Sequence, residues 1–389
     1  MKSPLKIAYV SRYNPHDKTT WSGAPYQTYH ALKNNFDEVT YIGPIGIEKW
    51  IYAILYCTMI GVEFLTAKRY YLGKNILSSR YYGFLIEKRL KKIKYDLIFT
   101  PAGTGEVAFL NTTKPVFHFA DSTYHQLINY YEFLTGLAKI SIAEGNYIER
   151  LAINKSTGLI YTSQWAAESA ISFYKADPRK ICIAPFGANI EKIPSRESLR
   201  YRCGHKAVCR LLLIGVDWVR KGGDLAFEAL VALNEMGVST TLTVVGCQPR
   251  AGLSHPGMSL IPFLNKNLES DVIIFERLLE QSHFLLVPTR AECQGIVFCE
   301  ASAYGLPSIT TDTGGVAASV ENGVNGYRLG FGASGMQYAE LIRQVFKDDG
   351  RYERLVLSSR LKFDKDLNWQ VWGSNVARFI NERVKALAD

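Results

Sequence analysis

The sequence predicts an α/β protein built from two doubly wound domains, each with a parallel sheet covered by helices on both faces. Short aliphatic and β-branched runs alternate with helical segments along most of the chain, which is typical of parallel sheets. The chain has 389 residues, and 47% of all residues are hydrophobic. This length fits two or three domains, and each can bury a core of its own.

The first domain is expected at residues 1–195. Its strands are predicted at Leu5–Ser11, Glu38–Ile42, Asp96–Thr100, Val116–Ala120, Gly158–Thr162 and Ile181–Pro185, with helices between them, for example at Tyr26–Asn35 and Gln164–Tyr174. The segment Ile193–Lys206 is polar, contains Pro and Gly and has no apolar periodicity, so a linker is predicted there.

A second series of strands and helices predicts a domain at 206–365. Strands are expected at Leu211–Gly215, Thr241–Gly246, Ser259–Phe263, Phe284–Pro288 and Ser308–Thr311, and helices at Asp224–Met236, Asn267–Gln281 and Ile296–Tyr304. Two such domains side by side are expected to enclose a cleft at the C-terminal ends of their strands. Residues 366–389 are predicted as a separate helix, because Asn368–Leu387 places its apolar residues on one face.

One segment of the first domain combines positive charge with aromatic residues. Residues 49–94 contain ten Lys and Arg but only Glu63 and Glu87 as acids, so this segment accounts for most of the formal charge of +9. Such a mixture is typical of proteins that bind an anionic membrane surface. A solvated helix face and a nucleic-acid site are the alternatives, and nucleic acid is the least expected partner. Within the segment, Trp50–Thr66 is predicted to be an amphipathic or half-buried helix rather than a membrane span.

Composition also excludes several classes of protein. The seven cysteines are scattered and form no C-x2-C pair, which argues against a disulfide framework and a structural zinc site. The N-terminal residues contain no signal-peptide pattern, so a cytoplasmic location is expected. No P-loop and no G-x-G-x-x-G after the first strand are present, which disfavours a nicotinamide oxidoreductase. Asp364-Lys365-Asp366 precedes the last expected helix, where capping is its expected role rather than metal binding.

The strongest chemical signal is A-E-C-Q-G-I-V-F-C-E-A, in which Glu292 and Glu300 are eight positions apart. Glu292 follows a predicted strand, and the amides of Gly295, Ile296 and Val297 form the first turn of the next helix. Such a turn attracts anions. Glu300 lies in an otherwise apolar helix, where ribose hydroxyls could hydrogen-bond its carboxylate; the alternative is a structural ion pair with an arginine.

A second signal, L-L-L-I-G-V-D-W-V-R-K-G-G-D-L, ends a strand at Gly215 and continues with Arg220 and Lys221 beside two glycines. Adjacent cations at the mouth of a parallel sheet suit a diphosphate. Taken alone, the residues Arg220–Asp224 also fit a solvated turn. The prediction of a diphosphate site therefore depends on their combination with Glu292 and Glu300.

Together these motifs resemble the family-4 retaining glycosyltransferases of the GT-B fold. The resemblance covers residues 211–329, including Asp312-Thr313-Gly314-Gly315 and the later Glu321-Asn322-Gly323. It implies that Arg220 and Lys221 bind the diphosphate of the donor and that Glu300 binds its ribose. It also implies that Glu292 and the amides of 295–297 hold the transferred sugar and distal phosphate, and that the backbone near Leu264 meets the base. The helix at 366–389 is expected to cross back onto the first domain, as in other GT-B chains. Gln294 departs from the family pattern, which often has Phe there, so the sugar contacts are in question.

On the acceptor side the resemblance implies a glycine loop after the first strand and His or Asp residues at the ends of middle strands. Gly23 fits the loop, Asp121 ends a strand and is the preferred catalytic candidate, and Gly103 ends another strand. His118 alternates with two phenylalanines, so a core histidine is the alternative reading.

The function expected from these residues is transfer of a hexose from a UDP-sugar to an acceptor hydroxyl, with retention and without a metal or cofactor. UDP-glucose is the favoured donor, because it is common in the family, and a lipid-linked saccharide is the favoured acceptor. The enzyme is then expected at the inner face of the plasma membrane, in polysaccharide or glycolipid biosynthesis. The alternatives are a UDP-sugar 2-epimerase of the same fold and a non-catalytic sugar-binding scaffold.

Overall fold

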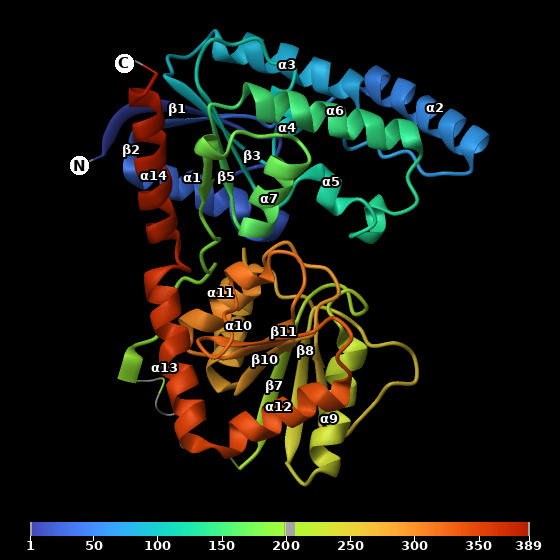
Figure 1. The fold of residues 1–389 in the computed structure, drawn as a ribbon, viewed down its shortest axis with the longest axis vertical. Coiled ribbons are helices and arrows are strands. Elements are labelled where there is room, and N and C mark those ends of the chain that lie inside the picture. Colours follow the sequence, from blue (N-terminus) through green and yellow to red (C-terminus); the bar gives the residue numbers. More distant parts are fainter. Residues whose placement is uncertain (1, 198, 200–206, 388–389) are drawn as a thin grey trace. The chain divides into compact units, whose positions relative to one another are not determined.

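The computed structural model describes residues 2–197, 199 and 207–387, which divide into two compact units (Figure 1). The first unit comprises Met1–Ala184 together with Trp372–Asp389, and the second comprises Pro185–Val371. Each unit contains one six-stranded sheet in which every pair of neighbouring strands is parallel. The prediction of two doubly wound α/β domains is confirmed. Residues 198 and 200–206 of the predicted linker lie outside the described part of the chain.

The strand order of the first unit is β2-β1-β3-β4-β5-β6. The strands are β1 (Ser3–Val10), β2 (Phe36–Ile42), β3 (Leu97–Pro101), β4 (Val116–Ala120), β5 (Gly158–Tyr161) and β6 (Ile181–Ile183). The main helices are α1 (Ala24–Asn35), α2 (Lys49–Thr66), α3 (Ile76–Leu90), α4 (Thr104–Val107), α5 (Tyr124–Leu127), α6 (Lys139–Lys155) and α7 (Gln164–Ser172). Short 3-10 turns occur at Thr20–Gly23, Glu132–Leu134 and Pro178–Lys180.

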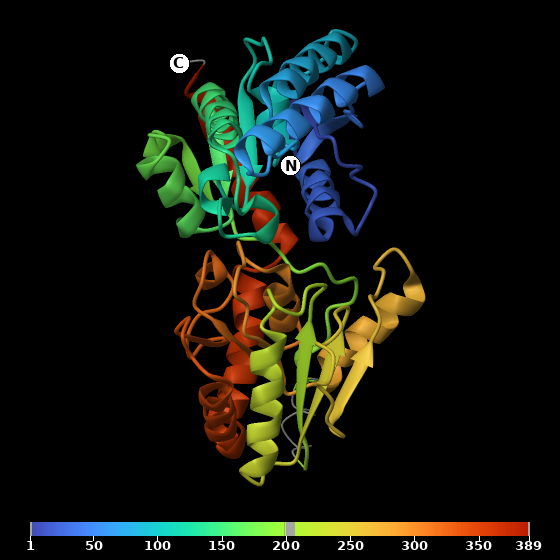
Figure 2. The same ribbon diagram turned by 90° about the vertical axis from the view of Figure 1, so that its right-hand side faces the viewer.

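Both faces of this sheet are buried, which explains why β3 and β4 are almost entirely apolar. One face, with Ile98 and Val116, packs against α3 and α6. The other face includes Phe99 and Phe119, whose rings contact Trp372 of α14 (Trp369–Lys385). Trp372 is buried in the first unit, so the apolar face predicted for the last helix covers this sheet. Figure 2 shows helices on both sides of the sheet.

The second unit has the strand order β12-β11-β10-β7-β8-β9. The strands are β7 (Cys209–Ile214), β8 (Thr240–Val245), β9 (Met258–Ile261), β10 (Phe284–Val287), β11 (Ser308–Thr311) and β12 (Gly326–Leu329), and the helices are α9 (Gly223–Glu235), α10 (Glu269–Gln281), α11 (Ile296–Ala303), α12 (Gly335–Lys347) and α13 (Asp349–Lys365), with a 3-10 turn at Val316–Ala318. In this order the chain runs outward in both directions from the neighbouring strands β7 and β10. Ligands of doubly wound domains bind at such a switch point, beside the C-terminal strand ends.

The sequence predicted an amphipathic or half-buried helix at Trp50–Thr66, and α2 is buried on one narrow side only. Only Ile51 and Leu55 of this helix are buried, and both lie on the side that faces the unit. By length and composition α2 could cross a membrane, with a mean hydropathy of 1.2 and 11% of its residues buried. A helix on the surface of a water-soluble domain normally places polar residues outward, so α2 is exceptional.

The predicted capping role of Asp364 and Asp366 is wrong. Asp364 lies inside α13 and pairs with Arg360 at 2.9 Å, and Asp366 pairs with Lys362 at 2.9 Å. Asn368 occupies the position before α14, and its side-chain oxygen accepts a hydrogen bond from the Val371 amide at 2.9 Å. The aspartates therefore stabilise the end of α13, where they attract the basic side chains of its last turn.

Candidate functional site

Two loops meet at the switch point of the second unit. One follows β7 and carries Arg220 and Lys221, and the other follows β10 and carries Glu292. Because β7 and β10 are adjacent parallel strands, their following loops leave the same edge of the sheet. The structure thus brings together the two motifs that are about 70 residues apart in the sequence.

The two cations share one carboxylate. The Lys221 ammonium forms an ion pair with Oε2 of Glu292, and a guanidinium nitrogen of Arg220 lies 3.5 Å from the same oxygen. Arg220 also donates a hydrogen bond to the Ala291 carbonyl at 3.1 Å, which orients the guanidinium. Lys221 is 8% exposed and Glu292 is 9% exposed, so this pairing lies in a poorly hydrated setting. Asp217, which is more exposed than Glu292, also lies 3.9 Å from the Arg220 guanidinium, so the two cations face two carboxylates here. A diphosphate would bring its own negative charge to the same two cations.

Glycines allow this close approach of the two loops. A Cβ at Gly215 would lie 2.4 Å from Cγ of Lys221, so the lysine stem lies directly over the glycine. Gly222 has a φ of +71° and is the N-cap of α9, and a Cβ there would lie 2.0 Å from the Pro288 carbonyl oxygen. A side chain at Gly215 would displace Lys221, and a side chain at Gly222 would push the two loops apart.

The turn into α11 provides the anion-attracting amides. Gly295 adopts a φ of +86° and forms the N-cap of this helix, so Ile296 and Val297 supply its first N–H groups. The side-chain amide of Gln294 binds other parts of the second unit and does not take part in this anion-attracting turn. Its oxygen accepts a hydrogen bond from the Phe186 amide at 2.8 Å, and its nitrogen donates to the Ser319 hydroxyl at 2.8 Å. In this chain the unusual Gln294 therefore holds neighbouring segments of the second unit together.

Glu300 has a partner that the sequence did not indicate. Its carboxylate is 3% exposed and forms an ion pair with Lys266, not with the arginine considered from the sequence. Burial raises the pKa of Glu300, although the Lys266 ammonium opposes this. Lys266 also donates to the Asn189 carbonyl at 3.4 Å and lies over the Phe275 ring. Leu264 lies two residues before Lys266, in the half-buried loop between β9 and α10.

The acceptor-side candidates belong to the first unit. Asp121 directly follows β4, and its carboxylate accepts hydrogen bonds from the Trp21 indole at 3.2 Å and the Ser122 hydroxyl at 3.2 Å. Trp21, Ser22 and Gly23 all have positive φ, so the loop before α1 is held in an unusual conformation. Asp121 therefore lies beside this glycine-containing loop.

Gly103 and His118 lie deeper in the first unit. A Cβ at Gly103 would be 1.9 Å from the Thr100 hydroxyl, so the turn after β3 has no room for a side chain. His118 is 1% exposed, and burial lowers its pKa to about 4. Gly103 and His118 thus both have structural roles. The sequence alone could not distinguish these roles from binding of the acceptor.

A buried ion pair, Lys74 with Glu149, interacts electrostatically with His118 and was not predicted from the sequence. Lys74 pairs with Glu149 of α6, which also accepts a hydrogen bond from the Thr104 hydroxyl at 2.9 Å. Burial raises the pKa of Glu149, but the Lys74 ammonium, a contribution from His118 and hydrogen bonds from Lys74 and Thr104 outweigh this effect, so the pKa of Glu149 lies below its usual range. No local pattern marked Glu149, because α6 also carries Glu144 and Arg150. A second pair, Arg12 with Glu106 at 2.8 Å, joins the segment after β1 to α4, which follows the adjacent strand β3.

The buried histidine predicts a specific pH dependence of stability. The pKa of His118 is about 4 when folded and near 6.5 when unfolded, so only the unfolded chain binds this proton as the pH falls below 6.5. The stability that neutral His118 provides is therefore complete above pH 6.5 and is lost as the pH falls toward 4. By pH 5 the loss is about 2 kcal/mol.

Denaturant unfolding at pH 7.5 and pH 5.0 measures this loss. In His118→Phe the change between the two pH values should be smaller than in the wild type by that amount. The matched control is His16→Phe, which alters an exposed histidine and should keep the wild-type pH dependence. An unchanged pH dependence in His118→Phe contradicts the assignment.

The chain is similar to known proteins both in sequence and in fold. Residues 209–348 match the family model described as Glycosyl transferases group 1. The chain is 31% identical over 199 residues to lipopolysaccharide glucosyltransferase WaaG of Escherichia coli K12, an alignment that covers 49% of this chain and 53% of the relative. The chain spans about half the length of the curated relatives it matches.

Solved structures are similar over nearly the whole chain. A crystal structure of WaaG is 20% identical and has a TM-score of 0.62, with 96% of this chain and 99% of that chain covered. An Anabaena protein solved with UDP and glucose is 15% identical and has a TM-score of 0.64, with 97% of this chain and 100% of that chain covered. At these identities the likeness concerns the fold, and it confirms the two-domain GT-B fold that the resemblance implied.

Proposed function

With the GT-B fold and the glycosyltransferase match of residues 209–348 as premises, we propose that this protein is a retaining glycosyltransferase that uses a UDP-sugar, with UDP-glucose as the first candidate. The observation that carries the proposal is the convergence of Arg220, Lys221 and Glu292 beside the first turn of α11. The relatives named above support the donor, since one is a glucosyltransferase and another was solved with UDP and glucose.

In the proposed reaction the bond between the sugar and the diphosphate breaks, and negative charge develops on the departing phosphate. Lys221 and Arg220 are held in place before the reaction by Glu292 and by the Ala291 carbonyl. Cations fixed in this way stabilise the developing charge without having to reorganise, and we propose that they make a metal ion unnecessary. The acceptor oxygen then bonds to the sugar on the face that the diphosphate leaves, which retains the configuration, and the proton of the acceptor hydroxyl passes to the departing phosphate oxygen. Asp121 is the candidate for orienting this hydroxyl.

Release of UDP from a panel of nucleotide sugars tests the proposal. A glycosyltransferase should hydrolyse its preferred donor slowly and release UDP faster when the acceptor is added. Isomer exchange without UDP release would instead indicate a UDP-sugar 2-epimerase. Absence of both reactions, with sugar binding intact, would indicate a scaffold.

The two glutamates should affect different steps. We expect Glu300→Gln to weaken UDP binding, because a neutral amide accepts weaker hydrogen bonds from the ribose hydroxyls. Glu292→Gln should lower turnover more than UDP affinity, because Glu292 orients Lys221 and contacts the transferred sugar. Calorimetry with UDP and initial rates with the preferred donor separate these effects.

The control for Glu300→Gln concerns its partner. The single substitution leaves Lys266 without its counter-charge, so the double variant Glu300→Gln with Lys266→Met removes both charges. UDP binding should remain weak in the double variant if Glu300 contacts the ribose. The opposite assignment, with Glu292 controlling affinity and Glu300 controlling turnover, would mean that the two roles are exchanged.

The first unit supports a membrane-borne acceptor. The outward residues of α2 between Trp50 and Phe64 carry no charge, and Phe64 and Leu65 are 86% and 81% exposed at its end. The single acidic residue of the helix, Glu63, is turned toward the domain and accepts a hydrogen bond from the Tyr70 amide at 3.0 Å. An uncharged apolar face exposed over a whole helix fits the headgroup region of a membrane.

Basic residues lie beside the beginning of this helix. A guanidinium nitrogen of Arg89 donates to the Pro44 carbonyl at 2.9 Å, and Trp50 contacts the ring of Tyr81 on α3. The basic residues at the end of α3 and just after it are Lys88, Arg89, Lys91, Lys92 and Lys94. We therefore propose that α2 lies in the surface of the anionic inner leaflet and does not span it, with a lipid-linked saccharide as acceptor. In this proposal the enzyme is a peripheral, cytoplasm-facing protein of polysaccharide or glycolipid assembly.

A further inference from the structure

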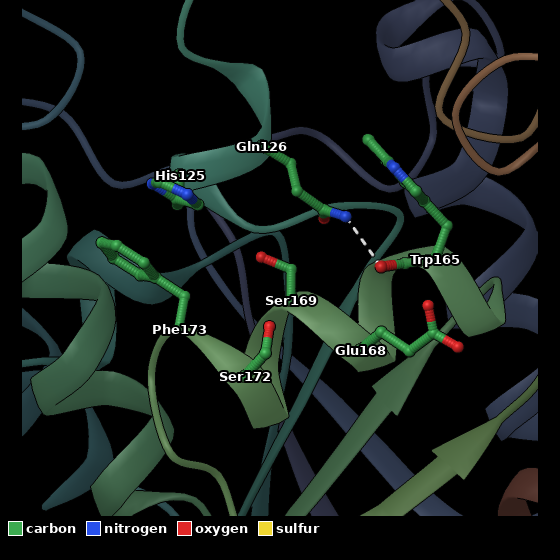
Figure 3. Close-up of a pocket in the computed structure, with 7 residues that line it drawn as sticks. All are labelled: His125, Gln126, Trp165, Glu168, Ser169, Ser172 and Phe173. Carbon is green, nitrogen blue, oxygen red and sulfur yellow. Dashed lines mark hydrogen bonds between the residues drawn. The ribbon is translucent and has the colours of Figure 1, made fainter.

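A pocket in the first unit lies outside all the residues discussed so far. It has a volume of about 370 Å³ and lies between α5 and α7 (Figure 3). Its lining residues are His125, Gln126, Trp165, Glu168, Ser169, Ser172 and Phe173. Ligand pockets for small molecules typically have volumes of a few hundred cubic ångströms, so one or two sugar rings are of suitable size.

The walls of the pocket are held in position by hydrogen bonds between the two helices. The Gln126 amide nitrogen donates to the Trp165 carbonyl at 2.7 Å, which joins α5 to the first turn of α7 (Figure 3). The hydroxyls of Thr123 and Ser169 are 2.7 Å apart and make a second link. A site fixed in this way loses little conformational entropy when a ligand binds.

The chemistry of the lining suits a neutral saccharide. The His125 ring is stacked on the Phe173 ring at 3.6 Å and 8°, and Trp165 lies on the opposite side, with the two serines between them (Figure 3). Aromatic rings can pack against the C–H face of a pyranose, and hydroxyl and carboxylate groups bond to its hydroxyls. Burial lowers the pKa of His125, which keeps this ring neutral near pH 7.

Charge distinguishes this pocket from the site of the second unit. Glu168 is the one charged residue of the lining, and the lining contains no lysine or arginine. A diphosphate or a uronic acid would meet a negative charge here, whereas a hydroxyl would find an acceptor. The pocket therefore selects against the anionic part of a nucleotide sugar.

The place of the pocket in the fold connects it to the acceptor side. His125 follows Asp121 by four residues, on the segment that leaves β4. The helix α7 begins just after β5, which pairs with β4 through Ala120 and Tyr161. The pocket thus opens near the same edge of the sheet as Asp121.

We infer that this pocket binds a neutral glycosyl residue, as a subsite for a sugar of the acceptor that does not react. The assignment of this sugar to the acceptor rests on the proposed function, whereas the binding of a neutral glycoside does not. A subsite of this kind requires an acceptor with at least two sugars, because one must reach the reacting position near Asp121.

Saturation-transfer NMR on the whole chain tests the inference, with methyl α-D-glucopyranoside, methyl β-D-galactopyranoside and methyl α-D-glucuronide as probes. A neutral glycoside should receive saturation from the protein, and the glucuronide should receive less. Glu168→Gln and Ser172→Ala alter exposed residues, so these variants should fold, and together they should weaken the affinity about 10-fold. The matched control is Glu353→Gln on the exposed face of α13, which should change nothing.

Excess UDP separates the two sites. If the glycoside occupies the pocket, saturation transfer should persist when UDP is added. Loss of the signal with UDP, or a signal unaffected by Glu168→Gln and Ser172→Ala, would overturn the inference. Binding of glycosides without turnover of any UDP-sugar would leave this site standing and refute the proposed activity, whereas turnover without glycoside binding would refute the site alone.

Discussion

Lys221→Met is expected to weaken UDP binding about 10- to 150-fold, which corresponds to the loss of one charge-assisted contact. Methionine keeps most of the side-chain length over Gly215, so the loop after β7 should keep its packing. The change also removes the ion pair of Glu292, whose remaining cationic neighbour is Arg220 at 3.5 Å. Calorimetric titration with UDP measures the affinity, and donor hydrolysis measures turnover.

Turnover should fall more than affinity in this variant, because the charge on the phosphate grows as the bond to the sugar breaks. Arg220→Ala should weaken UDP binding within the same range. The matched control is Lys347→Met, which removes an exposed lysine at the end of α12 in the same unit. Unchanged UDP affinity in both Lys221→Met and Arg220→Ala would show that the diphosphate binds elsewhere.

Replacing Lys88, Arg89, Lys91 and Lys92 together by serine should abolish sedimentation with anionic vesicles. Each basic residue near an anionic surface contributes about 1 kcal/mol, so four substitutions should lower membrane partitioning on the order of 1,000-fold. Sedimentation of the wild type should also fall as salt rises, because screening limits the attraction to about 8 Å at physiological ionic strength. UDP affinity should remain unchanged, since the cationic site of the second unit is unaltered.

The apolar part of the same surface has its own test. Phe64→Ser with Leu65→Ser removes the most exposed apolar side chains of α2 and should weaken binding to the same vesicles without changing its salt dependence. Leu361→Ser with Met336→Ser alters exposed apolar residues of the second unit and serves as the control. If the wild type does not sediment with anionic vesicles at low salt, the membrane proposal fails and a soluble acceptor is favoured.

Local sequence patterns sufficed for the strands and for the loops of the second unit. The strand predicted at 211–215 is followed within a few residues by Arg220 and Lys221, and the strand predicted at 284–288 by Glu292. The C-terminal ends of parallel strands lie at one edge of a sheet, so these positions alone predicted a common edge. Parallel strands buried on both faces are continuous apolar runs, which are visible in a single sequence. The glycines beside them marked turns for the same local reason.

Other features depend on pairs of residues far apart in the chain. Glu300 was recognised as a costly buried charge, but its partner Lys266 lies on another element, 34 residues away. The role of Gln294 depends on Phe186, which is 108 residues away. The local sequence pattern does not specify such partners, because many other polar groups of the chain could form the same ion pair or hydrogen bond.

The sequence by itself determined the two parallel sheets, the turn that carries Arg220 and Lys221, and the segment that carries Glu292 and Glu300. These features follow from periodicity and from the chemistry of neighbouring residues. Only the tertiary structure decided which carboxylate meets which cation, that His118 is buried near Glu149, and that α2 turns an uncharged face outward. These properties depend on packing between distant segments. Burial is the physical reason for both kinds of contact. A charge that is removed from water is stabilised only by a partner, and an apolar face that is left in water favours binding to a surface that covers it.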